Sequence, residues 1–346
     1  MCRRRGHCCR NWRSVVGRVN DQRHLQRAIE VAATARLRTS PNPWVGCVLV
    51  TADGRTFEGA TEPPGQRHAE RVALDAATAA GADTRGATAY VTLEPCSHHG
   101  RTPPCADALV QAGVARVVVA LDDPDPKVAG AGMARLRQAG VEVTSGVCAA
   151  ETAAQLAPYL HHRRTGRPFV VLKLATTLDG RIAAADGTSQ WITGVEARTA
   201  AHQLRAESDA IVVGAGTVRT DDPTLTTRLV DGPSPRRIVL GRAPAHAKVH
   251  PCTEWTGELD LLLAQLGADG VLQVMVEGGA RVAASFHTAG LVDRYVFHMA
   301  PALMGDGPGA LHHLTTPTIG EMWRGRIVAT RQLGADLEVV VEPIRL

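Results

Sequence analysis

Residues 94–105 read Glu-Pro-Cys-Ser-His-His-Gly-Arg-Thr-Pro-Pro-Cys, and the sequence His-Ala-Glu stands upstream at residues 68–70. The two cysteines and His68 are side chains of the kinds that bind zinc, and Glu70 is a carboxylate that need not bind it. A zinc ion with three protein ligands keeps a position for water and lowers the pKa of that water, while a nearby carboxylate moves protons. This is the set of groups that a hydrolytic deaminase of the nucleobase type requires.

The order of these residues along the chain favours a catalytic metal site. A strand expected over 89–93 delivers Cys96 at its end, and a helix expected over 104–112 carries Cys105 in its first turn. The positive end of that helix favours a thiolate. The alternative is a surface histidine and two unrelated buried cysteines. We interpret His68, Cys96 and Cys105 as zinc ligands and Glu70 as the proton carrier.

The spacing of the two cysteines is unusual for a zinc deaminase. Most such enzymes have two residues between them, whereas here residues 97–104 intervene and include His98, His99 and Arg101. An insert so rich in hydrogen-bond donors could hold a substrate phosphate close to the metal. A plain surface loop is the alternative.

The composition is that of a two-domain globular protein. The chain has 346 residues, of which 45% are hydrophobic and 21% charged, and its net charge of +4 suits anionic substrates without indicating nucleic acid. No apolar run approaches the roughly 20 residues of a membrane span. The first residues lack the apolar centre of a secretory signal. We therefore expect a cytoplasmic protein that does not bind membranes, with reduced cysteines.

The first residues are rich in arginine. Eight arginines fall between Arg3 and Arg27, which could form an RNA-binding arm. No aromatic platform accompanies them beyond Trp12, so a disordered basic leader over residues 1–20 is the preferred interpretation.

Hydrophobic periodicity predicts two α/β domains, with a boundary near Gly166, where turn residues follow an expected helix over 151–164. We assign residues 21–165 to a three-layer deaminase domain and residues 166–346 to a second α/β domain. In the first domain, helices are expected over 21–36, 67–80, 104–112 and 131–139, and strands over 45–50, 89–93, 114–121 and 141–145. In the second, strands are expected over 169–175, 210–213, 237–240, 273–276, 295–300 and 337–343.

The second domain lacks the Gly-x-Gly-x-x-Gly signature of a Rossmann fold. Glu277-Gly278-Gly279 follows an expected strand and precedes a helical stretch, so the glycines permit close backbone approach and the helix N-terminus favours a phosphate. A tight turn is an equal alternative. Lys173 lies within an apolar strand, where it either faces a ligand or marks a sheet edge. Trp191 belongs to the core or, given its polar neighbours, to the rim of a cleft.

The chain resembles the bifunctional deaminase/reductase of riboflavin biosynthesis over about residues 21–346. The matching stretches are Pro41-Asn42-Pro43, His68-Ala69-Glu70, residues 92–105, Asp123-Pro124-Asp125-Pro126, Thr165-Gly166-Arg167-Pro168, Leu178-Asp179-Gly180-Arg181, Ser189-Gln190-Trp191-Ile192-Thr193, residues 213–223, Glu277-Gly278-Gly279 and Ala300-Pro301. The resemblance implies a cytidine-deaminase-like domain followed by a dihydrofolate-reductase-like α/β domain.

The resemblance also implies an activity, cofactors and partners. The N-terminal domain would use Zn²⁺ to deaminate 2,5-diamino-6-ribosylamino-4(3H)-pyrimidinone 5′-phosphate. The C-terminal domain would use NADPH to reduce the ribosyl group, giving 5-amino-6-(5-phospho-D-ribitylamino)uracil. The partner is then a small phosphorylated pyrimidine rather than nucleic acid, and the expected assembly is a homodimer or higher homo-oligomer.

Site residues carry over from the family position by position. In the deaminase domain, the substrate residues would be Asn42, His98, Arg101 and Lys127. The NADPH residues would be Ala175, Trp191, Thr217, Asp221, Gly279, Ala280, Arg281, Val282, Ala283, Ala284 and Ser285. The reductase substrate residues would be Lys173, Ser189, Arg205, Leu225, Arg228 and Glu277.

Some positions depart from the family. Asp125 stands where asparagine is usual, and a carboxylate beside a substrate phosphate would repel it. Trp44 is bulky for its position. Residues 241–273 form a shorter stretch than usual, in which we expect no strand over 252–257. Arg242 replaces a small polar cofactor contact, and we hypothesise that it meets the 2′-phosphate of NADPH.

Three rival functions remain open at this point. The first is a zinc deaminase of RNA or nucleosides with a non-enzymatic C-terminal half. The second is a deaminase whose reductase half is degenerate and serves dimerisation. The third is a structural zinc protein, for which His99 is the nearest fourth ligand.

Overall fold

The computed structural model describes residues 6–97, 103–311, 314 and 316–344, with side chains described from residue 19 onward. Contacts within the chain divide it into two compact units, the first ending at Arg164 and the second beginning at Thr165.

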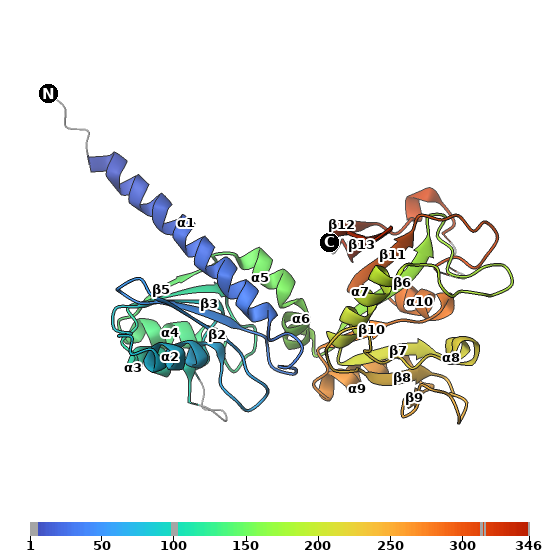
Figure 1. Ribbon diagram of the computed structural model, residues 1–346, viewed down its shortest axis with the longest axis horizontal. Coiled ribbons are helices and arrows are strands. Elements are labelled where there is room, and N and C mark those ends of the chain that lie inside the picture. The colour runs from blue at the N-terminus through green and yellow to red at the C-terminus, as the bar shows by residue number, and fades with distance from the viewer. Residues whose placement is uncertain (1–5, 98–102, 312–313, 315, 345–346) are drawn as a thin grey trace. The chain divides into compact units, whose positions relative to one another are not determined.

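The first unit is a three-layer α/β structure around a five-stranded sheet of order β2-β1-β3-β4-β5. Strand β1 is antiparallel to β2 and β3, whereas β3, β4 and β5 are mutually parallel. Helices α1 and α5 lie on one face of the sheet and α2, α3 and α4 on the other (Figure 1). Its elements are α1 Gly6–Ala33, β1 Gly46–Val50, β2 Thr56–Ala60, α2 Ala69–Ala79, β3 Thr88–Leu93, α3 Cys105–Gln111, β4 Arg116–Leu121, α4 Ala131–Gln138, β5 Glu142–Ser145, α5 Ala149–Gln155 and α6 Ala157–Thr165.

Helix α1 packs closely on β1. Leu25 and Ala28 of the helix share a buried cluster with Val48 of the strand. A Cβ atom at Gly46 would lie 2.0 Å from the carbonyl oxygen of Ala28, so only glycine permits this approach. The helix continues back to Gly6, so residues 6–20 of the leader expected to be disordered over residues 1–20 are helical, and residues 1–5 lie outside the described residues. Residues 6–40 contain no proline, so the backbone can extend the helix beyond its packed part.

The helix expected over 151–164 consists of two helices, α5 and α6. Pro158 lies in the first turn of α6. Proline has no N–H and cannot continue a preceding helix, but it is tolerated in a first turn. The break turns α6 so that Tyr159 and Arg163 reach the cavity described below.

The second unit is built on an eight-stranded sheet of order β12-β13-β11-β6-β10-β7-β8-β9. The strands from β11 to β9 are parallel, and β13 and β12 continue the sheet in antiparallel pairs. Its elements are β6 Phe169–Thr177, α7 Val195–Ala206, β7 Ala210–Gly214, α8 Ala215–Asp221, β8 Arg236–Leu240, β9 Thr253–Trp255, α9 Leu259–Ala268, β10 Gln273–Val276, α10 Ala280–Thr288, β11 Arg294–Ala300, the 3₁₀ helix Ile319–Glu321, β12 Gly325–Leu333 and β13 Asp336–Pro343.

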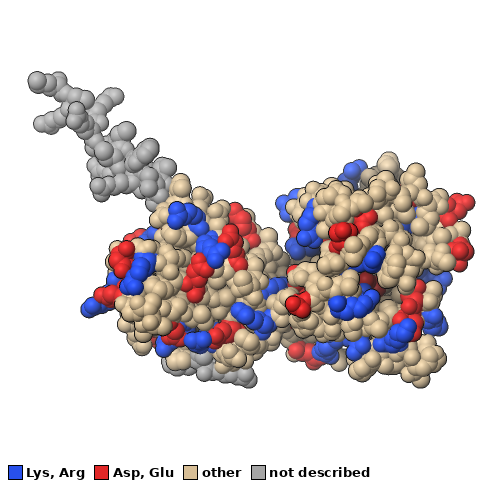
Figure 2. All heavy atoms as spheres, viewed as in Figure 1, with Lys and Arg blue, Asp and Glu red and all other residues tan. Residues whose placement is uncertain are grey.

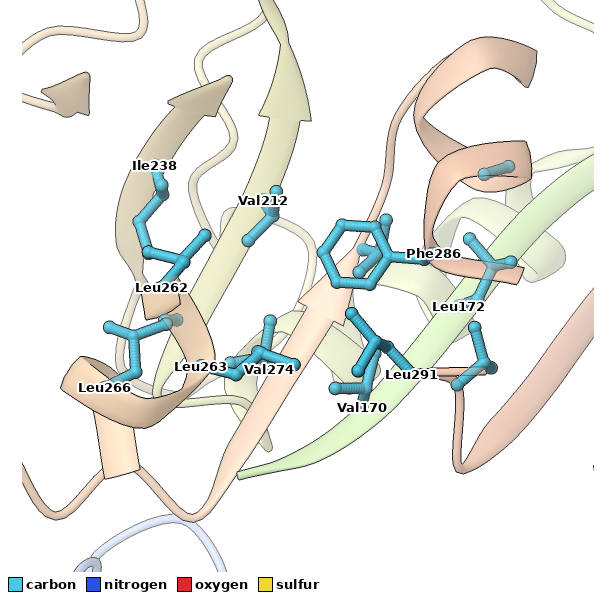
Figure 3. Packing of buried hydrophobic residues seen from close by; sticks show 14 of the residues in the cluster. Val170, Leu172, Val212, Ile238, Leu262, Leu263, Leu266, Val274, Phe286 and Leu291 are labelled. Carbon is cyan, nitrogen blue, oxygen red and sulfur yellow. The ribbon is translucent and has the colours of Figure 1, made fainter. Parts of the chain in front are cut away.

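The central strands of this sheet are apolar on both faces. Val212 of β7 packs with Leu263 and Phe286, which come from α9 and α10 (Figure 3). Its neighbours Ile211 and Val213 belong to a separate cluster on the opposite face. Side chains alternate between the two faces of a strand, so burial on both faces requires the continuous apolar runs that the sequence shows.

The expectation of no strand over 252–257 is wrong. Thr253–Trp255 forms β9, which pairs in parallel with β8 from Ile238↔Thr253 to Leu240↔Trp255. Its side chains are exposed or half-buried because it lies at the edge of the sheet, so no apolar run marks it. The shortened region therefore still completes this edge of the sheet.

Candidate functional sites

The first unit brings together the three expected metal ligands. The ligand atoms of His68, Cys96 and Cys105 lie within 4.8 Å of one another. The Nδ1 of His68 is 3.6 Å from the Sγ of Cys96 and 3.4 Å from that of Cys105. A tetrahedral zinc with ordinary bond lengths would hold nitrogen and sulfur ligands roughly 3.5 Å apart. The three side chains therefore fit zinc, and within the described residues the group has no fourth member.

Each ligand stands at the end of a regular element. His68 is the residue before α2, and Cys105 is the first residue of α3. The backbone N–H of Cys105 donates to the Sγ of Cys96 at 3.3 Å. Hydrogen bonds from the side chains of Cys105 and His68 outweigh burial and lower the pKa of Cys96 to about 4. The hydrogen bond with Cys96, followed by burial, raises the pKa of Cys105, so Cys96 is the thiol of the pair that ionises first.

Glu94 fixes the loop that carries Cys96. Its buried carboxylate accepts hydrogen bonds from the backbone N–H groups of Gly130 at 3.0 Å, Gly132 at 2.9 Å and Met133 at 3.1 Å. These groups begin helix α4, where N–H groups lack partners within the helix and favour a negative charge. Glu94 thus attaches the end of β3 to the start of α4.

Glu70 lies beside the metal group in the first turn of α2 and is only 3% exposed. Burial raises its pKa above the ordinary value, against the attraction of His68. A carboxyl group that holds its proton more firmly is suited to general acid–base catalysis near neutral pH.

A cavity of about 460 Å³ opens over Glu70, and His68 and Cys96 contribute to its wall. Of the expected substrate residues, Asn42 lines it. Lys127 is exposed and does not line it, although its backbone N–H donates to Asp125 at 3.0 Å. His98 and Arg101, like His99, lie outside the described residues. The wall also includes three residues that the sequence did not single out as site residues, namely Asp123, Tyr159 and Arg163.

The second unit contains a cavity of about 820 Å³, and an ion pair stands in its wall. The Nε and Nη2 atoms of Arg205 donate to the two carboxylate oxygens of Glu277 at 2.8 and 2.9 Å. Lys173, also buried, lines the same cavity. Lys173 belongs to β6, which lies between β11 and β10, so the sheet-edge alternative for this lysine is wrong.

Burial and neighbouring charge act on this group together. Burial lowers the pKa of Lys173, and attraction to Glu277 opposes that effect. Burial disfavours the charged form of Glu277, but attraction to Arg205 and Lys173 outweighs it and lowers the pKa of this carboxyl. The charged groups hold one another in place beneath the cavity.

The other expected substrate residues, Ser189, Leu225 and Arg228, line this cavity as well. His202, which no sequence motif marked, connects two parts of the wall. Its Nδ1 accepts the backbone N–H of Arg228 at 3.0 Å, and its Nε2 is 3.5 Å from Nη1 of Arg205. Burial, followed by repulsion from Arg205, lowers the pKa of His202 to about 4.

The expected cofactor residues divide into two groups. Five line the cavity, namely Ala175, Trp191, Thr217, Asp221 and Gly279. Trp191 is 63% exposed beneath the guanidinium of Arg198, which confirms its place on a rim rather than in the core. The other six, Ala280 to Ser285, belong to α10, which begins directly after Gly279. They do not line the cavity, although a helix N-terminus here suits a phosphate.

Comparisons with known proteins agree with both sites. A family model described as the cytidine and deoxycytidylate deaminase zinc-binding region matches residues 18–121, and one described as the RibD C-terminal domain matches residues 168–338. Riboflavin biosynthesis protein RibD of Escherichia coli K12 is 40% identical over 330 residues, which cover 83% of this chain and 89% of that protein. The chain belongs to the RibD family.

Other RibD proteins extend the match along the chain. RibD of Mycobacterium tuberculosis H37Rv is 41% identical over 90% of this chain and 94% of its own length. A solved structure of Acinetobacter baumannii RibD has a TM-score of 0.86 at 37% identity, covering 95% of this chain and all of its own. A Thermotoga maritima structure, that of a diaminohydroxyphosphoribosylaminopyrimidine deaminase/5-amino-6-(5-phosphoribosylamino)uracil reductase, has a TM-score of 0.87 at 32% identity and covers 95% of this chain.

As a RibD enzyme, the chain joins a zinc-dependent deaminase to an NADPH-dependent reductase of riboflavin biosynthesis. The expected fold class, a cytidine-deaminase-like domain followed by an α/β reductase domain, is confirmed. Membership of this family favours two active domains over the two alternatives in which the second domain is degenerate or the zinc is purely structural. Arg242 of this RibD chain is exposed and does not line the reductase cavity, so its contact with the 2′-phosphate stays a prediction.

One face of the molecule bears on the rival that acts on nucleic acid. On the face shown in Figure 2, basic and acidic side chains are interspersed over both units rather than gathered into one basic stripe. Within the described residues, no helix has the length and apolar character needed to cross a membrane.

Proposed function

We propose that this RibD enzyme acts on 2,5-diamino-6-ribosylamino-4(3H)-pyrimidinone 5′-phosphate, first replacing an exocyclic amine and then reducing the ribosyl group to ribityl. The observation that carries the proposal is the pair of cavities, one with a zinc-ligand group beside Glu70 and one with Lys173 beside the Arg205–Glu277 ion pair. The Thermotoga maritima protein is named for the same two activities.

In the deaminase site, His68, Cys96 and Cys105 would hold zinc, which when bound lowers the pKa of a water molecule toward about 7. Glu70 accepts a proton from the attacking water and passes it to the departing amine, so that ammonia leaves as the carbon–nitrogen bond breaks. Asn42 meets the pyrimidine edge, because its amide offers a donor and an acceptor together.

In the reductase site, Arg205 and Arg228 would face the substrate phosphate, since guanidinium groups match phosphate oxygens. Trp191, Thr217 and the start of α10 would hold NADPH, which when bound would supply a hydride to the sugar carbon. The ring oxygen gains a proton as the sugar opens. Lys173, whose pKa is lowered by burial, is suited to give that proton.

We further propose that the enzyme works in the cytoplasm as a homodimer or larger homo-oligomer. Light scattering on the purified full chain measures the assembly directly. A monomer at working concentration would contradict this part of the proposal.

The decisive experiment gives the purified enzyme the diaminopyrimidine ribosyl phosphate with and without NADPH. Without NADPH we expect release of ammonia and accumulation of the deaminated ribosyl product. With NADPH we expect the ribityl product and matching oxidation of the cofactor. Product masses distinguish the two steps. Absence of ammonia release from zinc-loaded enzyme would refute the proposal.

A further inference from the structure

One part of the wall of the deaminase cavity carries two acidic side chains. Asp123 and Asp125 both line it. Asp123 accepts hydrogen bonds from the hydroxyl of Tyr159 and from the backbone N–H of Asp125, so its carboxylate is already engaged. The carboxylate of Asp125 accepts the backbone N–H of Lys127 and is about a fifth exposed. A phosphate entering this cavity would meet its negative charge.

Arg163 places a positive charge on the same wall. Its Nε lies 3.4 Å from the carboxylate of Asp125, and its guanidinium stands over the ring of Tyr159, 5.0 Å from the centroid. The Nε atom is buried and makes no hydrogen bond within the described residues. The contact with Asp125 is therefore an ion pair without a directed hydrogen bond. Nη1 already lies 3.2 Å from Nδ1 of His162, so a further acceptor would be met by the remaining N–H groups of the guanidinium.

We propose that Arg163 is a specificity-determining residue of the deaminase site, which neutralises Asp125 and binds the anionic group of the substrate. Tyr159 sets its position by stacking, and α6 presents both residues on successive turns. Without Arg163, the wall would carry an unpaired carboxylate facing the substrate phosphate. The inference rests on the proposed function, because it requires a phosphorylated substrate.

A set of charge variants tests this proposal through KM for deamination. Arg163→Met should raise KM for the ribosyl phosphate by roughly tenfold and leave kcat little changed, since a binding charge is lost and a repulsive one exposed. Combining Arg163→Met with Asp125→Asn should restore most of the lost affinity, because the repulsion is removed as well. Arg163→Lys, which keeps the charge, should stay within a few fold of the wild type.

Three controls separate charge recognition from a structural role. The dephosphorylated ribosyl compound should show a KM that does not change in Arg163→Met. Arg164→Met, on the neighbouring exposed position of α6, should leave KM for the phosphate unaltered. Reduction of the deaminated substrate, measured on the same preparations, reports whether the rest of the chain is intact.

The outcomes are distinguishable from those of the proposed function. A wild-type enzyme that releases no ammonia refutes the proposed function and the inference with it. An active wild type whose Arg163→Met variant keeps its KM refutes the inference alone. The inference also falls if the loss is equal for the dephosphorylated compound or persists in the double variant. If Arg163→Met does not fold, Arg163→Lys provides the test. A tenfold rise in KM for the ribosyl phosphate in that variant, unchanged at high salt, would overturn the inference, because the charge is still present.

Discussion

Glu70 is the side chain on which deamination depends most directly. Glu70→Gln removes the proton carrier but not a metal ligand, so we predict full zinc content and a deamination rate lower by roughly 10²–10⁴. NADPH-dependent reduction of the deaminated substrate should not change, because Glu70 lines only the cavity of the first unit. Ammonia release, cofactor oxidation and zinc analysis on one preparation provide the measurements. Undiminished ammonia release would rule out the assigned role.

The protonation of His202 links the reductase cavity to pH. Because its Nδ1 accepts an N–H, the neutral ring carries its proton on Nε2. Its pKa is about 4 in the folded protein, against an ordinary value near 6.5. Between these values the unfolded chain binds the proton and the folded chain does not. The contribution of His202 to stability is therefore present above about pH 6.5 and is lost as the pH falls toward 4.

We predict the following from His202→Asn, which keeps an acceptor near the position of Nδ1 but does not titrate. Lowering the pH from 7.5 to 5 should reduce the free energy of unfolding of the wild type more than that of the variant. His202→Leu, which has no acceptor, should cost about 1 kcal/mol at pH 7.5. Urea unfolding at several pH values provides the comparison. If the difference in free energy of unfolding between the wild type and His202→Asn does not vary with pH, the lowered pKa of His202 is contradicted.

The site residues that the sequence located are those with local signals. His68, Glu70, Cys96 and Cys105 stand at helix starts or just after a strand, where a short motif identifies them. Arg163 and His202 have no such signal. Each matters through a partner distant in sequence, Asp125 in one case and Arg228 in the other, and only the folded chain brings them together.

At the scale of elements, the strands missed by the sequence share a position. The strands β2, β9 and β12 each lie at an edge of a sheet. Nearly all side chains of β12 are exposed, and those of β9 are exposed or half-buried. An edge strand is held by hydrogen bonds to one neighbour and buries little apolar surface, so no hydrophobic pattern marks it. The central strands β7 and β10 are buried on both faces, and their apolar runs predict them.

The junction of β3 and α4 gives a prediction at this scale. A Cβ atom at Gly132 would lie 1.8 Å from the carbonyl oxygen of Pro95, so Gly132→Ala must move α4 away from the loop that carries Cys96. We predict destabilisation of about 1–3 kcal/mol and weaker zinc binding. Gly216→Ala is the control, because its new Cβ meets no atom within 4 Å. Thermal unfolding and zinc titration test the pair, and equal behaviour of the two variants would contradict the prediction.

At the scale of the whole molecule, each unit has its own core and its own ligand. The described clusters of buried residues fall within one unit or the other, and so do both cavities. Units with separate cores can unfold separately, and a ligand stabilises only the unit that binds it. The two activities should therefore respond independently to loss of zinc and loss of NADPH.

We predict two thermal transitions for the full chain. Removing zinc with a chelator should lower one of them and abolish deamination, while the other transition and reduction persist. NADPH at a hundred times its dissociation constant should stabilise the other unit by about 2.7 kcal/mol, which raises its midpoint by several degrees in a unit of this size. Calorimetry with chelator, NADPH, both and neither resolves the four states. A single transition that shifts with either ligand would mean that the units unfold as one, because a ligand bound to one unit then stabilises both.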